Sequence, residues 1–103
     1  MANKCVVKIY PLAVQDLEQI FEYISVDLGN PTAGLKQIND FQKALDKVCE
    51  FPESCPVVKN EYVKDKTLRK LVVNNYIVFY RIRDNEIKVV RVIYGMRNYE
   101  NLL

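Results

Sequence analysis

Hydrophobic residues recur every three to four positions through two stretches of the first half of the chain. They are Ala13, Leu17, Ile20, Phe21, Ile24 and Leu28 in the first stretch, and Leu35, Ile38, Phe41, Leu45 and Val48 in the second. This spacing places them on one face of an α-helix. Pro11 and Pro31 suit the first position of a helix, and Gly29 and Asn30 suit a helix end followed by a cap. The pattern therefore predicts two helices that form an antiparallel hairpin, the second ending before Phe51-Pro52.

The second half of the chain is rich in β-branched and aromatic residues, which favour strands. A short strand is also predicted before the first helix, at residues 6–10. The further strands predicted are 68–73, 76–82 and 87–94, with a weaker one near 57–63. Asn74-Asn75 and Asp84-Asn85 suit tight turns between strands. The expected fold of residues 1–103 is one α+β domain of order β-α-α-β-β-β(-β), with the helix hairpin on one face of an antiparallel sheet.

A two-residue turn at Asp84-Asn85 fixes which side chains share a face of this sheet. It pairs Ile77 with Val92 and Phe79 with Val90. The other face then holds Tyr76, Val78, Tyr80, Val89 and Ile93. Both faces are apolar, and the helix hairpin covers only one. We therefore expect a free, partly aromatic face rimmed by Arg and Lys, which is typical of a binding surface. The alternative is that a C-terminal segment or a second copy of the chain covers it.

Composition narrows the class of protein. Of 103 residues, 50% are hydrophobic and 27% are charged, which is the balance of an ordinary soluble domain. No apolar run approaches the roughly 20 residues that a membrane helix needs. The first eight residues do not resemble a signal peptide, so a cytoplasmic location and no membrane partner are expected.

Cysteine and histidine usage bears on metal chemistry. The chain has no histidine, which removes imidazole as a base or a metal ligand, and its three cysteines include no Cys-x-x-Cys pair. We therefore expect no metal and no cofactor. The thiols are expected to be reduced, as in a cytoplasmic protein.

Charge is distributed unevenly along the chain. Residues 1–56 hold five Lys against eight acidic residues, a charge of −3, whereas residues 57–103 hold ten Lys and Arg against five acidic residues, a charge of +5. This asymmetry points to a negatively charged partner for the second half. The alternative is an unevenly charged surface with no dedicated partner.

Three segments resemble the RelE/ParE superfamily of toxins: residues 9–29, residues 69–80 and residues 87–99. They read Ile9-Tyr10-Pro11-x-Ala13-x-x-Asp16-Leu17-x-x-Ile20 with Tyr23-Ile24 and Gly29, then Arg69-Lys70-Leu71 leading into Asn75-Tyr76-Ile77-Val78-Phe79-Tyr80, then Ile87-x-Val89-x-Arg91-Val92-Ile93-Tyr94-Gly95-Met96-Arg97-Asn98-Tyr99. The resemblance implies the toxin of a type II toxin–antitoxin system, a stable growth inhibitor that stabilises plasmids and is neutralised by a labile antitoxin. RelE-like members cleave mRNA on the ribosome, and ParE-like members poison DNA gyrase.

The residues at the nuclease positions favour the ParE-like activity. Ile77 replaces an arginine of RelE-like sequences, and Leu103 falls where a catalytic tyrosine is found. Tyr94 replaces the histidine of other nucleases, and Leu68 replaces a lysine. If the chain is nevertheless an mRNA endoribonuclease, the resemblance implies that its catalytic residues are Arg97, Lys70 and Tyr94.

The remaining site residues are candidates for contact with the target or the antitoxin. They are Arg69, Arg81, Arg91, Arg97, Ile77, Phe79 and Tyr99. Arg81 and Arg91 have an alternative interpretation as partners of Asp84 or Glu86. The antitoxin is expected to wrap across the helices and the free sheet face, folding as it binds. The sequence leaves open the target, gyrase or the ribosome with mRNA, and whether a homodimer or a toxin–antitoxin hetero-oligomer forms.

Overall fold

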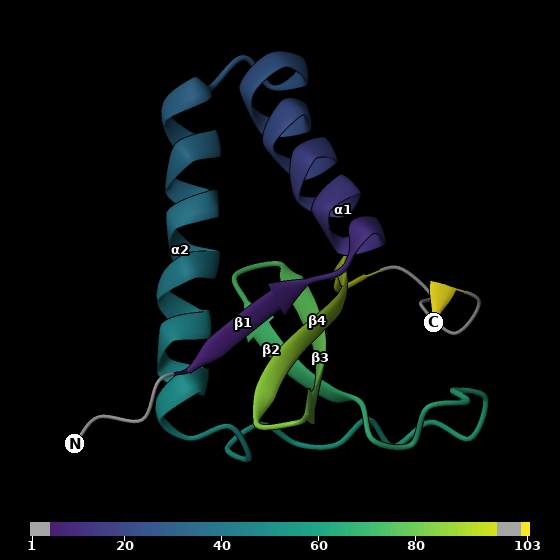
Figure 1. The fold of residues 1–103 in the computed structure, drawn as a ribbon. Helices are drawn as coiled ribbons and strands as arrows, with labels where there is room; N and C mark the ends of the chain where they lie inside the picture. The colour runs from purple at the N-terminus through teal and green to yellow at the C-terminus, as the bar shows by residue number, and fades with distance from the viewer. Residues whose placement is uncertain (1–4, 97–101) are drawn as a thin grey trace.

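The computed structural model describes residues 5–96 together with 102 and 103. These residues form two helices packed on one face of a four-stranded sheet (Figure 1). The elements are β1 (Val6–Ile9), α1 (Pro11–Glu22), the π-helical turn η1 (Tyr23–Asp27), α2 (Pro31–Glu50), β2 (Arg69–Val73), β3 (Tyr76–Arg83) and β4 (Glu86–Tyr94). The predicted α+β class and the helix hairpin are confirmed. None of the described helices is long and apolar enough to cross a membrane.

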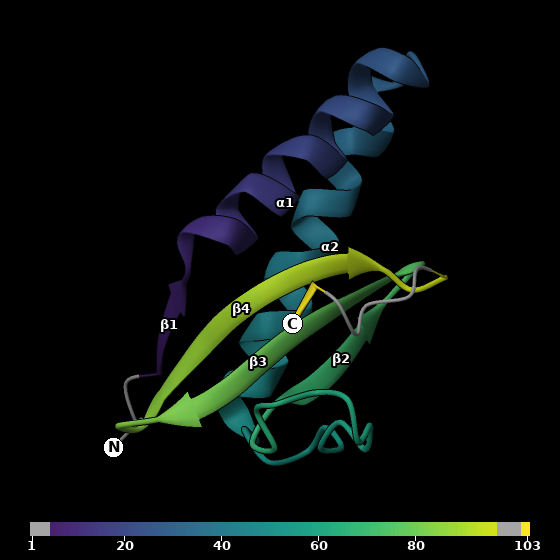
Figure 2. The ribbon, with the colours of Figure 1, turned by 90° about the vertical axis from the view of Figure 1, so that its right-hand side faces the viewer.

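The helix hairpin is closed by the residues that the sequence pointed to. Gly29 takes a left-handed conformation, with φ 65°, that ends the first helical segment. The Asn30 side chain accepts a hydrogen bond from Ala33 N at 3.1 Å and so caps α2, which Pro31 opens. Figure 2 shows that the joined ends of the two helices extend beyond the sheet. The inner side of this part of the hairpin is therefore not covered by strands.

The sheet is mixed rather than wholly antiparallel. Its strand order is β1-β4-β3-β2, in which β2, β3 and β4 form the predicted antiparallel meander. Asn74, Asp84 and Asn85 have φ values of 55°, 56° and 60°, as tight hairpin turns require. Strand β1 pairs parallel to β4 at the edge. This pairing is possible because the whole helix hairpin separates β1 from the meander, which frees it from the geometry of a short turn.

A β-bulge in the β3–β4 pair changes the predicted faces. Tyr80 of β3 pairs with Val89 of β4. The preceding residue of β3, Phe79, pairs with Arg91, so Val90 has no partner on β3. The extra residue moves every later side chain of β4 to the opposite face. The predicted pairs Ile77–Val92 and Phe79–Val90 are therefore wrong. Ile93 lies opposite Ile77 and shares its face.

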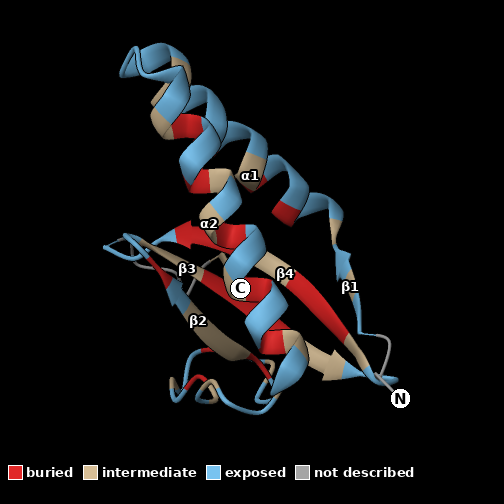
Figure 3. Ribbon diagram, turned by 90° about the vertical axis from the view of Figure 1, so that its left-hand side faces the viewer, coloured by how far each residue is buried: buried red, intermediate tan, exposed pale blue. Residues whose placement is uncertain are grey.

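The larger core lies between the helices and the sheet. Figure 3 shows buried segments recurring along α2 where it crosses the sheet, and along β3 and β4. The buried residues are Ala13, Ile20, Phe41, Leu45, Val48, Val73, Val78, Tyr80, Ile87, Val89 and Val92. The helix positions among them belong to the apolar stripes that the sequence predicted.

The reverse face of the sheet is not free, which corrects the sequence expectation. The segment between α2 and β2 folds across it and brings Val58, Val63 and Leu68 onto Phe79 and Ile93. Leu102 and Leu103, near the C-terminus, pack against the same cluster. The weak strand predicted near 57–63 forms only an isolated bridge, between Val57 and Arg69, among the described residues. Its hydrophobic residues serve as a cover for the sheet instead, which neither alternative raised above had named; only the contacts of Leu102 and Leu103 agree with the predicted C-terminal cover.

Cys5 and Cys49 form a disulfide with an S–S distance of 2.04 Å, so the expectation that all thiols are reduced is wrong. The bond connects the start of β1 to the last turn of α2 across 44 positions of sequence. Cys55 remains a free thiol. Pairing cannot be read from cysteine spacing here, because only the parallel docking of β1 brings Cys5 beside α2.

Candidate functional site

Arg91, predicted as a binding residue, holds the structure together. Its Nε lies 2.7 Å from Asp16 Oδ2 and its Nη2 lies 2.9 Å from Asp16 Oδ1, while Nη1 donates to the Leu102 carbonyl at 3.0 Å. The hydrogen bonds to Asp16 raise the pKa of Arg91 above its ordinary value. Neither of the expected partners, Asp84 or Glu86, is involved.

The Asp16 carboxylate also completes the edge of the sheet. Strand β1 pairs with β4 only as far as Val89. The Val89 carbonyl accepts a hydrogen bond from Tyr10 N at 2.9 Å. Farther along β4, Val92 N donates to Asp16 Oδ2 at 2.9 Å. A side chain of α1 thus replaces the missing strand partner. The sequence had indicated Asp16 only as a position shared with the RelE/ParE superfamily, not as an ion-pair partner.

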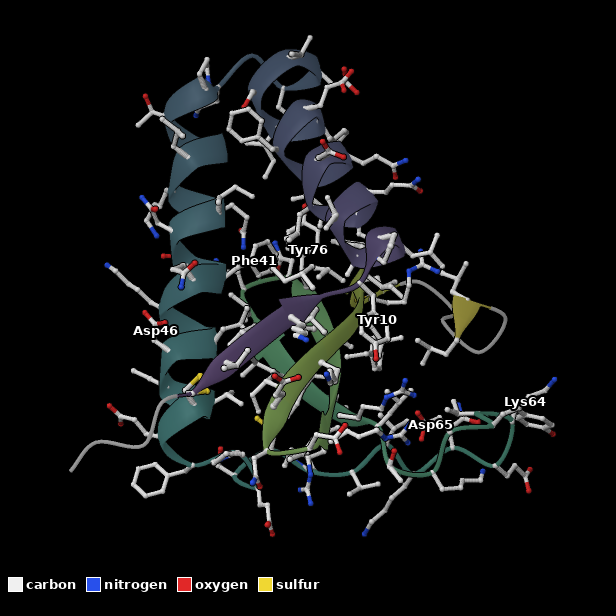
Figure 4. The ribbon with its side chains drawn as sticks, viewed as in Figure 1. Tyr10, Phe41, Asp46, Lys64, Asp65 and Tyr76 are labelled. Carbon is white, nitrogen blue, oxygen red and sulfur yellow. A yellow bond between two sulfur atoms is a disulfide. The ribbon has the colours of Figure 1, made fainter. Side chains whose placement is uncertain are left out.

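Arg81 is also engaged internally. Its Nη1 donates to Asp65 Oδ2 at 2.8 Å and its Nη2 to the Tyr10 hydroxyl at 3.3 Å, with the guanidinium 5.6 Å from the centre of the Tyr10 ring. The hydrogen bond from Arg81 lowers the pKa of Tyr10. Figure 4 shows Tyr10 and Asp65 on the same side of the molecule. Asp65 belongs to the segment that covers the sheet, so its ion pair with Arg81 attaches that segment to β3.

The other predicted residues lie in different surroundings. Arg69 donates to the carbonyls of Cys55 at 2.7 Å and Glu53 at 3.3 Å, which fixes the covering segment. Phe79 is 0% exposed, and Ile77 packs beside it. Arg97 and Tyr99 lie outside the described residues.

Lys70 and Tyr94 are accessible to different degrees. Lys70 is partly exposed on β2, and its backbone N–H donates to Pro56 O at 3.0 Å. Tyr94 is exposed at the end of β4. Among the predicted residues that the structure describes, only Arg91 and Tyr94 line the cleft described next.

An open cleft of about 720 Å³ lies between the helix hairpin, the β2–β3 turn and the end of β4. Its lining residues are Asp16, Gln19, Ile20, Tyr23, Ile24, Leu28, Ala33, Lys36, Gln37, Asp40, Asn74, Asn75, Tyr76, Arg91, Val92, Ile93 and Tyr94. The cleft therefore gathers residues from both helices and from the far end of the sheet, which are distant in sequence.

One wall of the cleft is aromatic. Tyr76 makes edge contacts with Phe41, at 5.7 Å between ring centres, and with Tyr94, at 5.9 Å. Figure 4 shows Phe41 and Tyr76 together between the two helices. Burial raises the pKa of Tyr76, and its neighbours Tyr23 and Tyr94 raise it further. Tyr23 is 51% exposed, so the wall ends in an accessible ring at the opening. Aromatic surfaces of this kind are favourable contacts for a bound chain.

Another part of the lining is polar and hydrogen-bonded. Asn74 Nδ2 donates to Gln37 Oε1 at 3.1 Å and to Asp40 Oδ2 at 2.9 Å, and Lys36 Nζ lies 3.0 Å from the same Asp40 oxygen. The hydrogen bonds from Asn74 and then Lys36 lower the pKa of Asp40. Both carboxylates in the lining, Asp16 and Asp40, are thus held in ion pairs. The arrangement favours binding over proton transfer.

Sequence reasoning did not identify this site, although parts of the signal were present. Leu28 belongs to the predicted apolar stripe of the first helix, yet it is exposed because the hairpin extends beyond the sheet. Asn74 was recognised as a turn residue, and its side chain serves the cleft as well. No local pattern indicates that Gln37 meets Asn74, because 37 positions separate them.

Comparisons with known proteins agree with this architecture. The family model of the ParE toxin of the type II toxin–antitoxin system parDE matches residues 7–99. No curated protein sequence matches the chain.

Solved structures of toxin–antitoxin systems share the fold. The chromosomal ParDE system from P. aeruginosa aligns with a TM-score of 0.69 at 18% identity, covering 87% of this chain and 95% of that one. The RelBE2 complex from Mycobacterium tuberculosis aligns with a TM-score of 0.60 at 18% identity, covering 86% and 95%. The RelE–RelB complex from Pyrococcus horikoshii OT3 gives 0.55 at 22% identity, covering 93% and 100%. Because the family model spans nearly the whole chain, the chain belongs to the ParE toxin family of type II toxin–antitoxin systems.

Proposed function

We propose that this ParE-family toxin arrests growth by poisoning DNA gyrase, and that a cognate antitoxin in the same cytoplasm neutralises it. The observation that carries the proposal is the match of the ParE toxin model to residues 7–99. The target follows from the ParE-like resemblance noted in the sequence.

The surroundings of four candidate site residues support gyrase over mRNA, although Lys70, named above for the nuclease alternative, is partly exposed. Cleavage of RNA requires cations free to stabilise the charge that develops on the phosphate. Arg69, Arg81 and Arg91 instead bind acceptors within the protein. Ile77, at a position where RelE-like sequences have arginine, packs against the second core.

The cleft is the site proposed for the antitoxin. An antitoxin segment that folds on binding needs apolar contacts to offset the entropy lost in ordering it. The aromatic wall and the exposed Leu28 at the opening supply such contacts. Several structures with this fold are of toxin–antitoxin complexes, which supports a proteinaceous occupant.

The target is tested with purified components. Wild-type chain is added to gyrase with relaxed plasmid, and in parallel to a translation reaction with a defined mRNA. We expect loss of supercoiling with accumulation of gyrase–DNA cleavage complexes, and intact message. Cut message with unaffected gyrase would contradict the proposal and establish the nuclease alternative.

The role of Arg97 is tested by substitution. Arg97→Ala is expected to weaken growth arrest without lowering thermal stability. Arg83→Ala is the matched control, because it removes the same charge at an exposed position.

The site is tested by Leu28→Asp, which places a charge at the lip of the cleft. We expect this variant to arrest growth but to escape the antitoxin. Val26→Asp is the matched control, because Val26 is similarly exposed on η1 but does not line the cleft. Equal protection of both variants by the antitoxin would place its binding elsewhere.

A further inference from the structure

The orientation of the Gln37 amide is determined by a chain of hydrogen bonds that starts at Asp40. The lowered pKa of Asp40 keeps it ionised at neutral pH, and an ionised carboxylate only accepts hydrogen bonds. Asn74 must therefore present its NH₂ group, which lies 2.9 Å from Asp40 Oδ2. The same group lies 3.1 Å from the Gln37 oxygen. Gln37 thus gives its oxygen to Asn74, and its own NH₂ group is directed away from this pair.

That NH₂ group has no hydrogen-bond partner among the described residues. Gln37 is only 9% exposed, and its Nε2 is buried. A buried donor without an acceptor is unfavourable, and natural proteins contain few. Ser25 Oγ and Arg81 Nε are also buried and unpartnered, but neither residue lines the cleft. Gln37 does line it, one helical turn before Phe41, whose ring contacts Tyr76.

We propose that Gln37 is a specificity-determining residue of the cleft, whose fixed amide donor selects a partner segment carrying an acceptor oxygen beside an apolar side chain. The inference rests on the proposed binding of an antitoxin in the cleft. The apolar side chain packs on the rings of Tyr23, Tyr76 and Tyr94. The oxygen, from a backbone carbonyl or from a carbonyl or carboxylate side chain, approaches Gln37. A segment without this oxygen leaves the donor unsatisfied and binds more weakly.

The first test removes the donor. Gln37→Met keeps the size and unbranched shape of the side chain, and its affinity is measured by calorimetry against the antitoxin encoded beside the toxin gene. We expect binding about tenfold weaker than wild type, the effect of one lost hydrogen bond. Gln42→Met, on the exposed side of the same helix, is the matched control and should bind within about twofold of wild type. Asn74→Gly preserves the positive φ of the turn and the Gln37 donor, and should lose less affinity than Gln37→Met.

The second test uses a side chain whose donor can be switched off. In Gln37→Glu, a protonated carboxyl still accepts from Asn74 and donates to the bound segment. The ionised carboxylate loses the donor and repels the partner oxygen. Burial raises the pKa of such a carboxyl, so affinity should be near wild type at low pH and fall as pH rises. A wild-type protein titrated in parallel should lack this additional dependence. If the partner group is a carboxylate, high salt should relieve part of the loss, whereas a carbonyl partner should not respond.

The outcomes separate this inference from the proposal on which it rests. If Gln37→Met and Gln37→Glu bind as wild type while Leu28→Asp does not bind, the antitoxin occupies the cleft without using Gln37, and the inference is overturned alone. If wild-type toxin does not bind the antitoxin, or if Leu28→Asp binds normally, the proposed site fails as well. Weaker binding of Gln37→Met together with a new pH dependence in Gln37→Glu supports the inference.

Discussion

Asp16 on α1 and Arg91 on β4 form a bidentate ion pair, although 75 positions separate them in sequence. The same carboxylate accepts from Val92 N, and the same guanidinium donates to Leu102 O. One pair of side chains therefore connects the first helix, the unpaired edge of the sheet and the C-terminal end that covers its reverse face.

Asp16→Asn should destabilise the fold strongly. The substitution leaves a largely buried guanidinium without its counter-ion, and breaking such a pair costs about 3 kcal/mol or more. Urea denaturation of the isolated toxin measures the loss. Lys36→Ala breaks the exposed Lys36–Asp40 pair and should cost only about 0.5 kcal/mol. Similar losses for both variants would contradict the role assigned to Asp16.

Gly34→Ala should push α2 away from the Phe21–Ser25 part of the hairpin. A Cβ at this position would lie 2.2 Å from Ser25 Oγ and 3.3 Å from Phe21 Cδ1, so we expect a loss of about 1–2 kcal/mol from overpacking. Ser25→Ala removes the blocking oxygen, which is buried and unpaired. The double variant should recover to at least wild-type stability, because alanine is favoured over glycine within a helix by about 1 kcal/mol. Thermal melts of the three variants test this, and a double variant as unstable as Gly34→Ala would contradict it.

Reduction of the Cys5–Cys49 disulfide should lower stability without abolishing the fold. Closing a loop across 44 positions restricts the unfolded chain, and its release costs up to about 4 kcal/mol in the chain-entropy estimate. Urea denaturation with and without dithiothreitol measures the difference. Cys55→Ser should keep this dependence on reductant, and Cys5→Ser should lose it.

Asp40 should titrate below an ordinary aspartate. Its carboxyl, with a lowered pKa, stabilises the folded state above the unfolded pKa of about 3.9, and this contribution is lost as pH falls through the folded pKa. Asn74→Gly removes the first cause of the shift, so the pKa of Asp40 should move up toward its usual value. Carboxyl carbon resonances followed by NMR report it directly. An unchanged titration in the variant would show that the Asn74 hydrogen bond does not control Asp40.

The parts of the fold that the sequence predicts are those determined by residues close together in the chain. Gly29, Asn30 and Pro31 define the helix hairpin, and Asp84-Asn85 defines a turn, because each acts through backbone preferences within a few positions. The apolar stripes likewise predicted the buried helix positions Ala13, Ile20, Phe41, Leu45 and Val48. Three other stripe residues, Phe21, Leu28 and Leu35, are exposed.

The cleft and the covered face could not be predicted in this way. The Val90 bulge involves no glycine or other local mark, yet it reverses the face of Ile93. The roles of Arg81 and Arg91 depend on Asp65 and Asp16, which only the folded chain brings within reach. A charged residue in a strand indicates that a partner exists, but sequence alone does not distinguish an internal carboxylate from an external phosphate.

Val90 has a consequence for variation in chain length. Deleting one residue from a strand normally moves every later side chain of that strand to the opposite face of the sheet. At this position the strand already carries one residue more than its neighbour, so a deletion would restore an even ladder and leave Arg91, Val92 and Ile93 facing as they do now. Relatives one residue shorter here can therefore keep the same interior on both sides of the sheet.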